Sequence, residues 1–145
     1  MPVVEIWIHA VWTTKNRNPL LTDELMKPLF RHIRDYADEK GFYIDFINGV
    51  SDHVHCLLSL KANQALSEAM KFIKGESSHW INQNNLTSEK FSWQNEFYAA
   101  SVCVSQLQSL RKYIKNQKRH HGEINFETEM NKLKTESSVA QLPWV

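Results

Sequence analysis

Two histidines one residue apart, His53 and His55, are the first side chains in this sequence whose types and spacing could do chemistry. They belong to the segment SDHVHCLLSL, residues 51–60, whose aliphatic and β-branched residues follow a polar turn-forming pair and indicate a β-strand. Because side chains alternate between the faces of a strand, both imidazoles should point the same way, with Val54 on the opposite face. Two such imidazoles can bind one divalent metal ion. The alternative is a hydrogen-bonded histidine pair at a sheet edge.

A second segment carries a candidate nucleophile, Tyr113. Residues 109–121 contain no glycine or proline, and the apolar residues Leu107, Leu110 and Ile114 recur at helical spacing. Tyr113 and Gln117 are four residues apart, so they should share one face of the predicted helix. Gln117 could therefore add an oxygen ligand close to the tyrosine.

Positive charge is concentrated on the same predicted helix. Residues 105–122 contain no acidic side chain and carry a local charge of +5, whereas the whole chain is only +1 and the remainder is therefore −4. Such a cluster suits a phosphate backbone, although a solvated helix face is the alternative. The five cations are Arg111, Lys112, Lys115, Lys118 and Arg119.

Taken together, these segments resemble the HUH-type single-tyrosine transposases, the small insertion-sequence transposases and their REP-associated relatives. The resemblance rests on the HVH strand and on a helix that reads YIKNQKRHH from Tyr113. WIHAVWTTKNR, residues 7–17, is similar to the first strand of that family. KGESS, residues 74–78, and the stretch 93–102 are similar to its middle blocks. The similarity covers roughly residues 5–127 in the family's order, with Glu96 as a departure where the family often has glycine.

The resemblance implies an enzyme that cleaves and rejoins single-stranded DNA through a 5′-phosphotyrosine intermediate. Tyr113 would be the nucleophile, and His53, His55 and Gln117 would hold a divalent metal, Mg²⁺ or Mn²⁺. The substrate would be single-stranded DNA at the hairpin ends of a mobile or repeated element. The enzyme would act as a homodimer in the cytoplasm of a bacterium or archaeon, associated with the nucleoid.

Several cations are candidate contacts to DNA phosphates. The resemblance places the basic turn at residues 15–19 near the DNA, the stretch 74–78 is a candidate phosphate contact, and the basic helix is a candidate through its charge. Three aromatic residues, Trp12, Phe91 and Trp93, could stack on bases, but core packing is the better interpretation for each of them. The candidate phosphate contacts are Lys15, Arg17, Lys74, Arg111, Lys112, Lys115, Lys118 and Arg119.

Two other functions remain open at this stage. A metal-dependent nuclease or zinc site could recruit Cys56, which should however face away from the histidines. Cys103, His120 or His121 could complete such a site. A non-catalytic or domesticated nucleic-acid-binding protein is the second alternative, although such sheets usually expose aromatic side chains rather than histidines.

Element order predicts the fold class. Strands and helices are expected in the order β-α-β-β-α-β-α, with Thr22 as the N-cap of the first helix. This is an α+β, ferredoxin-like or RRM-like fold, an antiparallel sheet of about four to five strands with helices packed on one face. At 145 residues the chain is expected to be a single domain, with a core over about 3–122 and a polar tail over 123–145. Two cysteines argue against a disulfide scaffold, and neither a signal peptide nor a membrane span is expected.

Overall fold

A four-stranded antiparallel sheet forms the centre of the computed structural model, which describes residues 3–118 and 125–141. The strands lie in the order β2-β3-β1-β4, so the N-terminal strand and the histidine strand are the two central ones. They pair along their whole length, from Ile6 opposite Leu60 to Thr13 opposite His53. The α+β antiparallel fold predicted from the sequence is confirmed. The strands are β1 (Ile6–Thr13), β2 (Tyr43–Val50), β3 (His53–Leu60) and β4 (Tyr98–Ser101).

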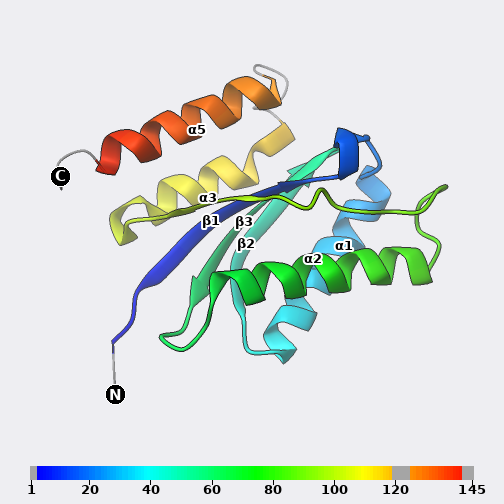
Figure 1. Ribbon diagram of the computed structural model, residues 1–145, viewed down its shortest axis with the longest axis horizontal. Coiled ribbons are helices and arrows are strands. Elements are labelled where there is room, and N and C mark those ends of the chain that lie inside the picture. Colours follow the sequence, from blue (N-terminus) through cyan, green and yellow to red (C-terminus); the bar gives the residue numbers. More distant parts are fainter. Residues whose placement is uncertain (1–2, 119–124, 142–145) are drawn as a thin grey trace.

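One face of the sheet is covered by two long helices, α1 (Asp23–Glu39) and α2 (Leu66–Gln83) (Figure 1). Thr22 caps α1 as predicted, because its hydroxyl accepts a hydrogen bond from the backbone N–H of Leu25. The main core lies between these helices and the sheet side chains of one parity, among them Val54. Gly75 lies inside α2, which runs through it without a break.

Helices also cover the opposite face, so the expectation of helices on one face describes only α1 and α2. Figure 1 shows α3 (Leu107–Lys115) and α5 (Phe126–Gln141) on the side of the sheet away from α1 and α2. The reason is that β3 carries buried side chains on both faces. Leu57 lies on the second face and is fully buried in a small cluster with Leu107 and Ile114. That face, which also bears both histidines, therefore needs a cover of its own.

The β2–β3 connection is a tight turn. Asn48-Gly49 lies inside β2, and the chain reverses at residues 51–52, which is the predicted polar turn. A Cβ atom at Gly49 would lie 2.5 Å from the carbonyl oxygen of His53. Glycine is thus required for β2 to approach the start of the histidine strand.

The remaining elements are short connections. The 3₁₀ turn Lys15–Arg17 follows β1, and the 3₁₀ turn Val104–Gln106 precedes α3. The fourth strand is short and covers four residues. Among the helices in the described ranges, none is both long and apolar enough to cross a bilayer. The division into a core over 3–122 and a tail stays a prediction.

Candidate functional site

Both histidines of β3 are completely buried, on the sheet face that α3 and α5 cover. Their ring centroids lie 5.3 Å apart, and the rings are inclined at 64°. Each ring therefore points to the same face of the strand, as predicted from the alternation of side chains. No member of the pair is at a solvent-exposed sheet edge, because β3 is a central strand.

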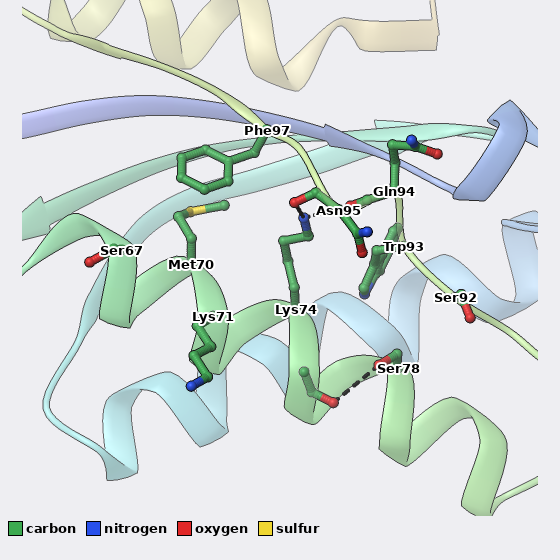
Figure 2. Close-up of a pocket in the computed structure, with 11 residues that line it drawn as sticks. Ser67, Met70, Lys71, Lys74, Ser78, Ser92, Trp93, Gln94, Asn95 and Phe97 are labelled. Carbon is green, nitrogen blue, oxygen red and sulfur yellow. Dashed lines mark hydrogen bonds between the residues drawn. The ribbon is translucent and has the colours of Figure 1, made fainter.

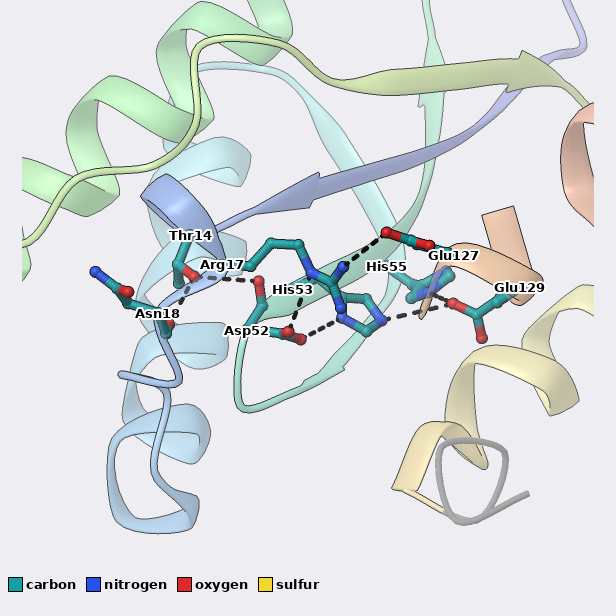
Figure 3. A network of polar contacts seen from close by, with 8 residues as sticks. All are labelled: Thr14, Arg17, Asn18, Asp52, His53, His55, Glu127 and Glu129. Carbon is teal, nitrogen blue, oxygen red and sulfur yellow. Dashed lines mark hydrogen bonds and ion pairs between the residues drawn. The ribbon is translucent and has the colours of Figure 1, made fainter. Parts of the chain in front are cut away.

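A carboxylate that the sequence analysis did not single out lies between the two imidazoles. Oε1 of Glu129, on α5, is 2.9 Å from Nε2 of His55 and 3.5 Å from Nε2 of His53 (Figure 3). Glu129 is 1% exposed, and one ligand atom from each of the three residues lies within 4.8 Å of the others. Two imidazole nitrogens and a carboxylate oxygen form a suitable donor set for a divalent cation.

The Nδ1 atoms of the pair are engaged by two further residues. Nδ1–H of His53 donates to Asp52 at 2.7 Å, and Nδ1 of His55 lies 2.9 Å from Nε2 of His9 on β1. When Nδ1 carries the proton, the lone pair of Nε2 is available to a metal. Asp52 and His9 are therefore placed to aim both Nε2 atoms at the same point.

Burial and charge act in opposite directions on these groups. Burial lowers the pKa of His53, but hydrogen bonds and charge from Asp52 and Glu129 outweigh it and raise the pKa above its usual value. At His9 the balance is reversed: burial and the neighbouring His55 outweigh the opposing charge of Glu129 and lower the pKa to about 3. His9 is accordingly neutral at physiological pH.

Tyr113 reaches the same site from α3. Its ring centroid is 5.6 Å from that of His55 and 6.4 Å from that of His9. Burial alone would raise the pKa of Glu129, but hydrogen bonds from His53, His55 and the Tyr113 hydroxyl hold it well below its usual range. A phenol, two imidazoles and a carboxylate thus meet within one chain.

Gln117 is fully buried near this cluster, but it does not continue the tyrosine helix. α3 ends at Lys115, and Asn116 departs from helical geometry with φ −98° and ψ 27°. The Gln117 amide still donates to the carbonyl oxygen of Tyr113 at 3.3 Å. Its Oε1 atom has no hydrogen-bond partner within the described part of the chain. A buried amide oxygen without a hydrogen-bond partner is suited to bind a cation.

Two contacts from β2 fix the position of α3. The guanidinium of Arg111 donates to both carboxylate oxygens of Asp45, at 2.6 and 3.2 Å. At the other end of the helix, the Asn48 side-chain amide donates to the carbonyl oxygens of Ile114 and Lys115, both at 3.0 Å. These bonds satisfy helix-end acceptors and hold Tyr113 against the histidine strand.

Arg17 joins the site through a second polar network (Figure 3). Its Nε lies 3.4 Å from Asp52, and its guanidinium lies 4.7 Å from the ring centroid of Phe126 at the start of α5. Glu127 is 4.0 Å away. Asn16 and Arg17 both adopt left-handed backbone angles, with φ of 58° and 55°, which is uncommon away from glycine. The basic turn is therefore held beside the metal-ligand candidates.

Lys74 is held by backbone carbonyl groups in a groove of about 430 Å³ between α2 and residues 92–97 (Figure 2). Its ammonium donates to the carbonyl oxygens of Gln94 at 2.6 Å and Asn95 at 3.0 Å. Burial lowers its pKa. Lys74 thus fastens residues 94–95 to α2, and its predicted contact with a phosphate stays a prediction.

The other predicted phosphate contacts differ in their surroundings. Lys118 pairs with Asp23 at 2.5 Å, and Arg111 is engaged by Asp45. Three exposed lysines have side chains available to a phosphate backbone: Lys15, Lys112 and Lys115. Arg119 and the candidate zinc ligands His120 and His121 lie outside the described residues.

Cysteine ligation and base stacking receive no support from the geometry. Cys56 is fully buried in the main core on the opposite face from the histidines, where burial raises the pKa of its thiol to about 12. Cys103 is exposed and free. The three candidate stacking residues, Trp12, Phe91 and Trp93, are between 1% and 6% exposed and belong to the core, which was the better interpretation from the sequence.

Comparisons with known proteins agree with this geometry. Residues 2–117 match the family model described as "Transposase IS200 like". The chain is 27% identical over 120 residues to the ISDra2 transposase TnpA of Deinococcus radiodurans. The aligned region covers 79% of this chain and 86% of that protein.

Two solved structures share the fold. A crystal structure of a transposase from Deinococcus radiodurans R1 matches with a TM-score of 0.64 and 24% identity, over 80% of this chain and 93% of that one. A REP-associated tyrosine transposase bound to a REP hairpin matches with a TM-score of 0.62 and 19% identity, over 86% and 73% of the two chains.

Proposed function

Since the chain belongs to the family of IS200-like transposases, enzymes that cleave and rejoin DNA, we propose that it cuts single-stranded DNA through a covalent bond to Tyr113. The observation that carries this proposal is the position of the phenol. Tyr113 lies against His55 in the same chain and donates a hydrogen bond to the carboxylate beside it.

The proposed reaction is a transesterification. The phenolic oxygen of Tyr113 attacks the scissile phosphorus, and the bond from that phosphorus to the 3′ oxygen of the preceding nucleotide breaks. The products are a 5′-phosphotyrosine and a free 3′-OH, which takes up the proton lost by the phenol. Attack by another 3′-OH reverses the step, so the phosphodiester bond energy is conserved.

The protein's own groups assist this chemistry in three ways. The α3 contacts to Asp45 and Asn48 orient the phenol before the substrate arrives. The carboxylate of Glu129 accepts the phenolic hydrogen bond. Arg17, beside Asp52, places a permanent positive charge next to the site, where a phosphate would approach.

A divalent metal fits the residues present. His53 and His55 offer two Nε2 atoms on one side of the site, and the buried Oε1 of Gln117 lacks a partner among the described residues. We propose that these three residues bind Mg²⁺ or Mn²⁺, which suit mixed nitrogen and oxygen ligands with open positions for water. When bound, the ion neutralises charge on the non-bridging phosphate oxygens.

The substrate and setting are also proposals. The structural relative bound to a REP hairpin supports a hairpin at the end of a mobile or repeated element as the DNA recognised by this chain. Exposed lysines on α3 would contact its backbone. We further propose that the protein acts as a homodimer on DNA in the cytoplasm.

The test is a gel assay with end-labelled single-stranded DNA hairpins carrying randomised flanks, in the presence of Mn²⁺. Wild-type protein should form an adduct that survives SDS. The adduct should be absent in Tyr113→Phe and in His53→Ala, and present in the matched control Tyr43→Phe, because Tyr43 is a 53% exposed residue. Binding of the hairpins by the wild type without any adduct would instead support a non-catalytic DNA-binding protein.

A further inference from the structure

We propose that Glu129, carried by the C-terminal helix α5, is a protein ligand of the metal ion at His53 and His55. This inference rests on the metal site in the proposed function and adds to it a residue from a different helix. Its consequence is that binding of the metal also fastens α5 to the sheet.

The geometry of the donor atoms is the first argument. The carboxylate Oε1 of Glu129 faces both Nε2 atoms, at 2.9 and 3.5 Å, which are the two atoms left for a metal once Asp52 and His9 engage the Nδ1 atoms. A cation at this position would have two nitrogen ligands and one carboxylate oxygen from a single chain. Open coordination positions would remain for water or a phosphate oxygen.

Burial is the second argument. Glu129 is 1% exposed although it is acidic, and carboxylates are almost never fully buried unless they are paired or bind a metal. Its neighbour Glu127, two residues earlier, has an 83% exposed side chain. The first turn of α5 is therefore oriented so that one particular carboxylate enters the site.

The surroundings of Glu129 show how α5 is held in this orientation. Phe126, three residues earlier, packs against the ring of His53 with a centroid distance of 4.4 Å. The guanidinium of Arg17 also contacts Phe126, at 4.7 Å from its ring centroid. These contacts guide Glu129 to the histidines, and a shared metal would strengthen the attachment.

A carboxylate ligand changes the charge of the centre. Two neutral imidazoles and Gln117 would leave the full +2 charge of the ion, whereas Glu129 lowers the net charge to +1. Gln117 and Glu129 are not mutually exclusive, because an octahedral ion accepts two nitrogen and two oxygen ligands with two positions to spare. The role of Glu129 is thus separable from that of Gln117 by mutation.

Calorimetric titration of the full chain with MnCl₂ tests the ligand role directly. Glu129→Gln keeps the size and hydrogen-bonding capacity of the side chain, and it should weaken Mn²⁺ binding on the order of 10–100-fold. Glu127→Gln removes the same charge from the same helical turn and should leave the affinity unchanged. Wild-type affinity in Glu129→Gln would overturn the proposal.

A second titration separates this inference from the proposed function. If His53→Ala loses Mn²⁺ binding while Glu129→Gln retains it, the metal site stands and the role of Glu129 is refuted. If His53→Ala binds as the wild type does, the proposed metal site itself fails. Glu129→His should shift the preference from Mn²⁺ toward Zn²⁺, because three imidazoles favour zinc; an unchanged preference would also count against the ligand role.

Hydrogen exchange of the wild-type protein tests the coupling without relying on any variant's stability. Amides of residues 126–133 should exchange more slowly with saturating MnCl₂ than without metal, and this added protection should vanish in Glu129→Gln. Protection confined to the region around His53, with none on α5, would show that the metal does not hold the helix.

Discussion

Nε2 of His9 lies 2.9 Å from Nδ1 of His55, so a third histidine supports one of the paired histidines from the neighbouring strand. The two rings are nearly parallel, with centroids 5.1 Å apart. Since His9 is neutral and buried, its Nε2 can accept a hydrogen bond from Nδ1–H of His55, which leaves Nε2 of His55 available to a metal. The ring of His9 also contacts Tyr113, so it touches both functional groups of the site.

Removal of this support should weaken metal binding without abolishing the fold. We expect His9→Ala to lower Mn²⁺ affinity roughly 10-fold or more, because the ring of His55 loses its orienting acceptor. His9→Gln offers an amide oxygen at a similar reach and should recover part of the affinity. The measurement is calorimetric titration with MnCl₂, and equal affinities in all three proteins would show that His9 only fills space.

The lowered pKa of His9 predicts a contribution to acid sensitivity. In the unfolded chain this histidine takes up a proton near pH 6.5, whereas in the folded protein it resists protonation down to about pH 3. Stability should therefore fall as the pH drops below 6.5, by on the order of 2 kcal/mol from this residue at pH 5. The raised pKa of His53 acts in the opposite direction, so a variant comparison is needed.

Urea unfolding of wild type and His9→Gln at pH 7 and pH 5 provides that comparison. The loss of stability between the two pH values should be smaller in His9→Gln, because glutamine at position 9 takes up no proton in the unfolded state. A loss of equal size in both proteins would refute the assignment to His9.

Two glycines should respond in opposite ways to alanine. In Gly49→Ala the new methyl group would lie 2.5 Å from the His53 carbonyl oxygen and 3.2 Å from Cα of Val54, so the strands must separate. We expect a loss of about 1–3 kcal/mol in unfolding free energy. Gly75→Ala meets no atom within 4 Å and should gain about 0.5–1 kcal/mol, because alanine favours the helix. Urea unfolding measures both, and a neutral Gly49→Ala would contradict the close approach.

The cations of α3 should separate into one that fixes the helix and others that contact DNA. Arg111→Ala breaks the paired hydrogen bonds to Asp45, so it should lower the melting temperature and reduce adduct formation. The side chain of Lys115 is exposed, so Lys115→Ala should leave the fold intact and weaken binding to single-stranded DNA. Its salt slope, log Kd against log salt, should fall by about 0.7 for one lost phosphate contact.

Fluorescence anisotropy with a labelled single-stranded oligonucleotide in EDTA, at several salt concentrations, measures those slopes. An unchanged salt slope in Lys115→Ala would refute the DNA contact of Lys115. A changed salt slope with unchanged stability in Arg111→Ala would show that Arg111 contacts DNA instead of fixing the helix.

Much of the fold could be predicted from local patterns in the sequence. Alternation of side chains placed His53 and His55 on one face, and the capping preference of Thr22 marked the start of α1. The proximity of Tyr113 to the histidines followed from the resemblance to a known family, and the structure shows it in one chain. The catalytic and metal-binding roles of these residues stay predictions.

What the sequence could not supply were contacts between distant residues. Glu129 is 74 residues from His55 and sits in a stretch that reads as a polar tail, where no local pattern distinguishes it from Glu127. The partnership of His9 with His55 depends on the pairing of β1 with β3. The break at Asn116 lies where Asn48 of β2 binds the last carbonyl groups of α3, whereas residues 109–121 alone favour one continuous helix.

The fastening of α3 to β2 by Asp45 and Asn48 has a consequence for stoichiometry. For Tyr113 to reach the histidines of a second copy, α3 would first have to lose its hydrogen bonds to Asp45 and Asn48. Tyr113 already contacts His55 of its own chain. Each polypeptide would then make its cut autonomously, and mixing Tyr113→Phe with His53→Ala in equal amounts would restore no activity.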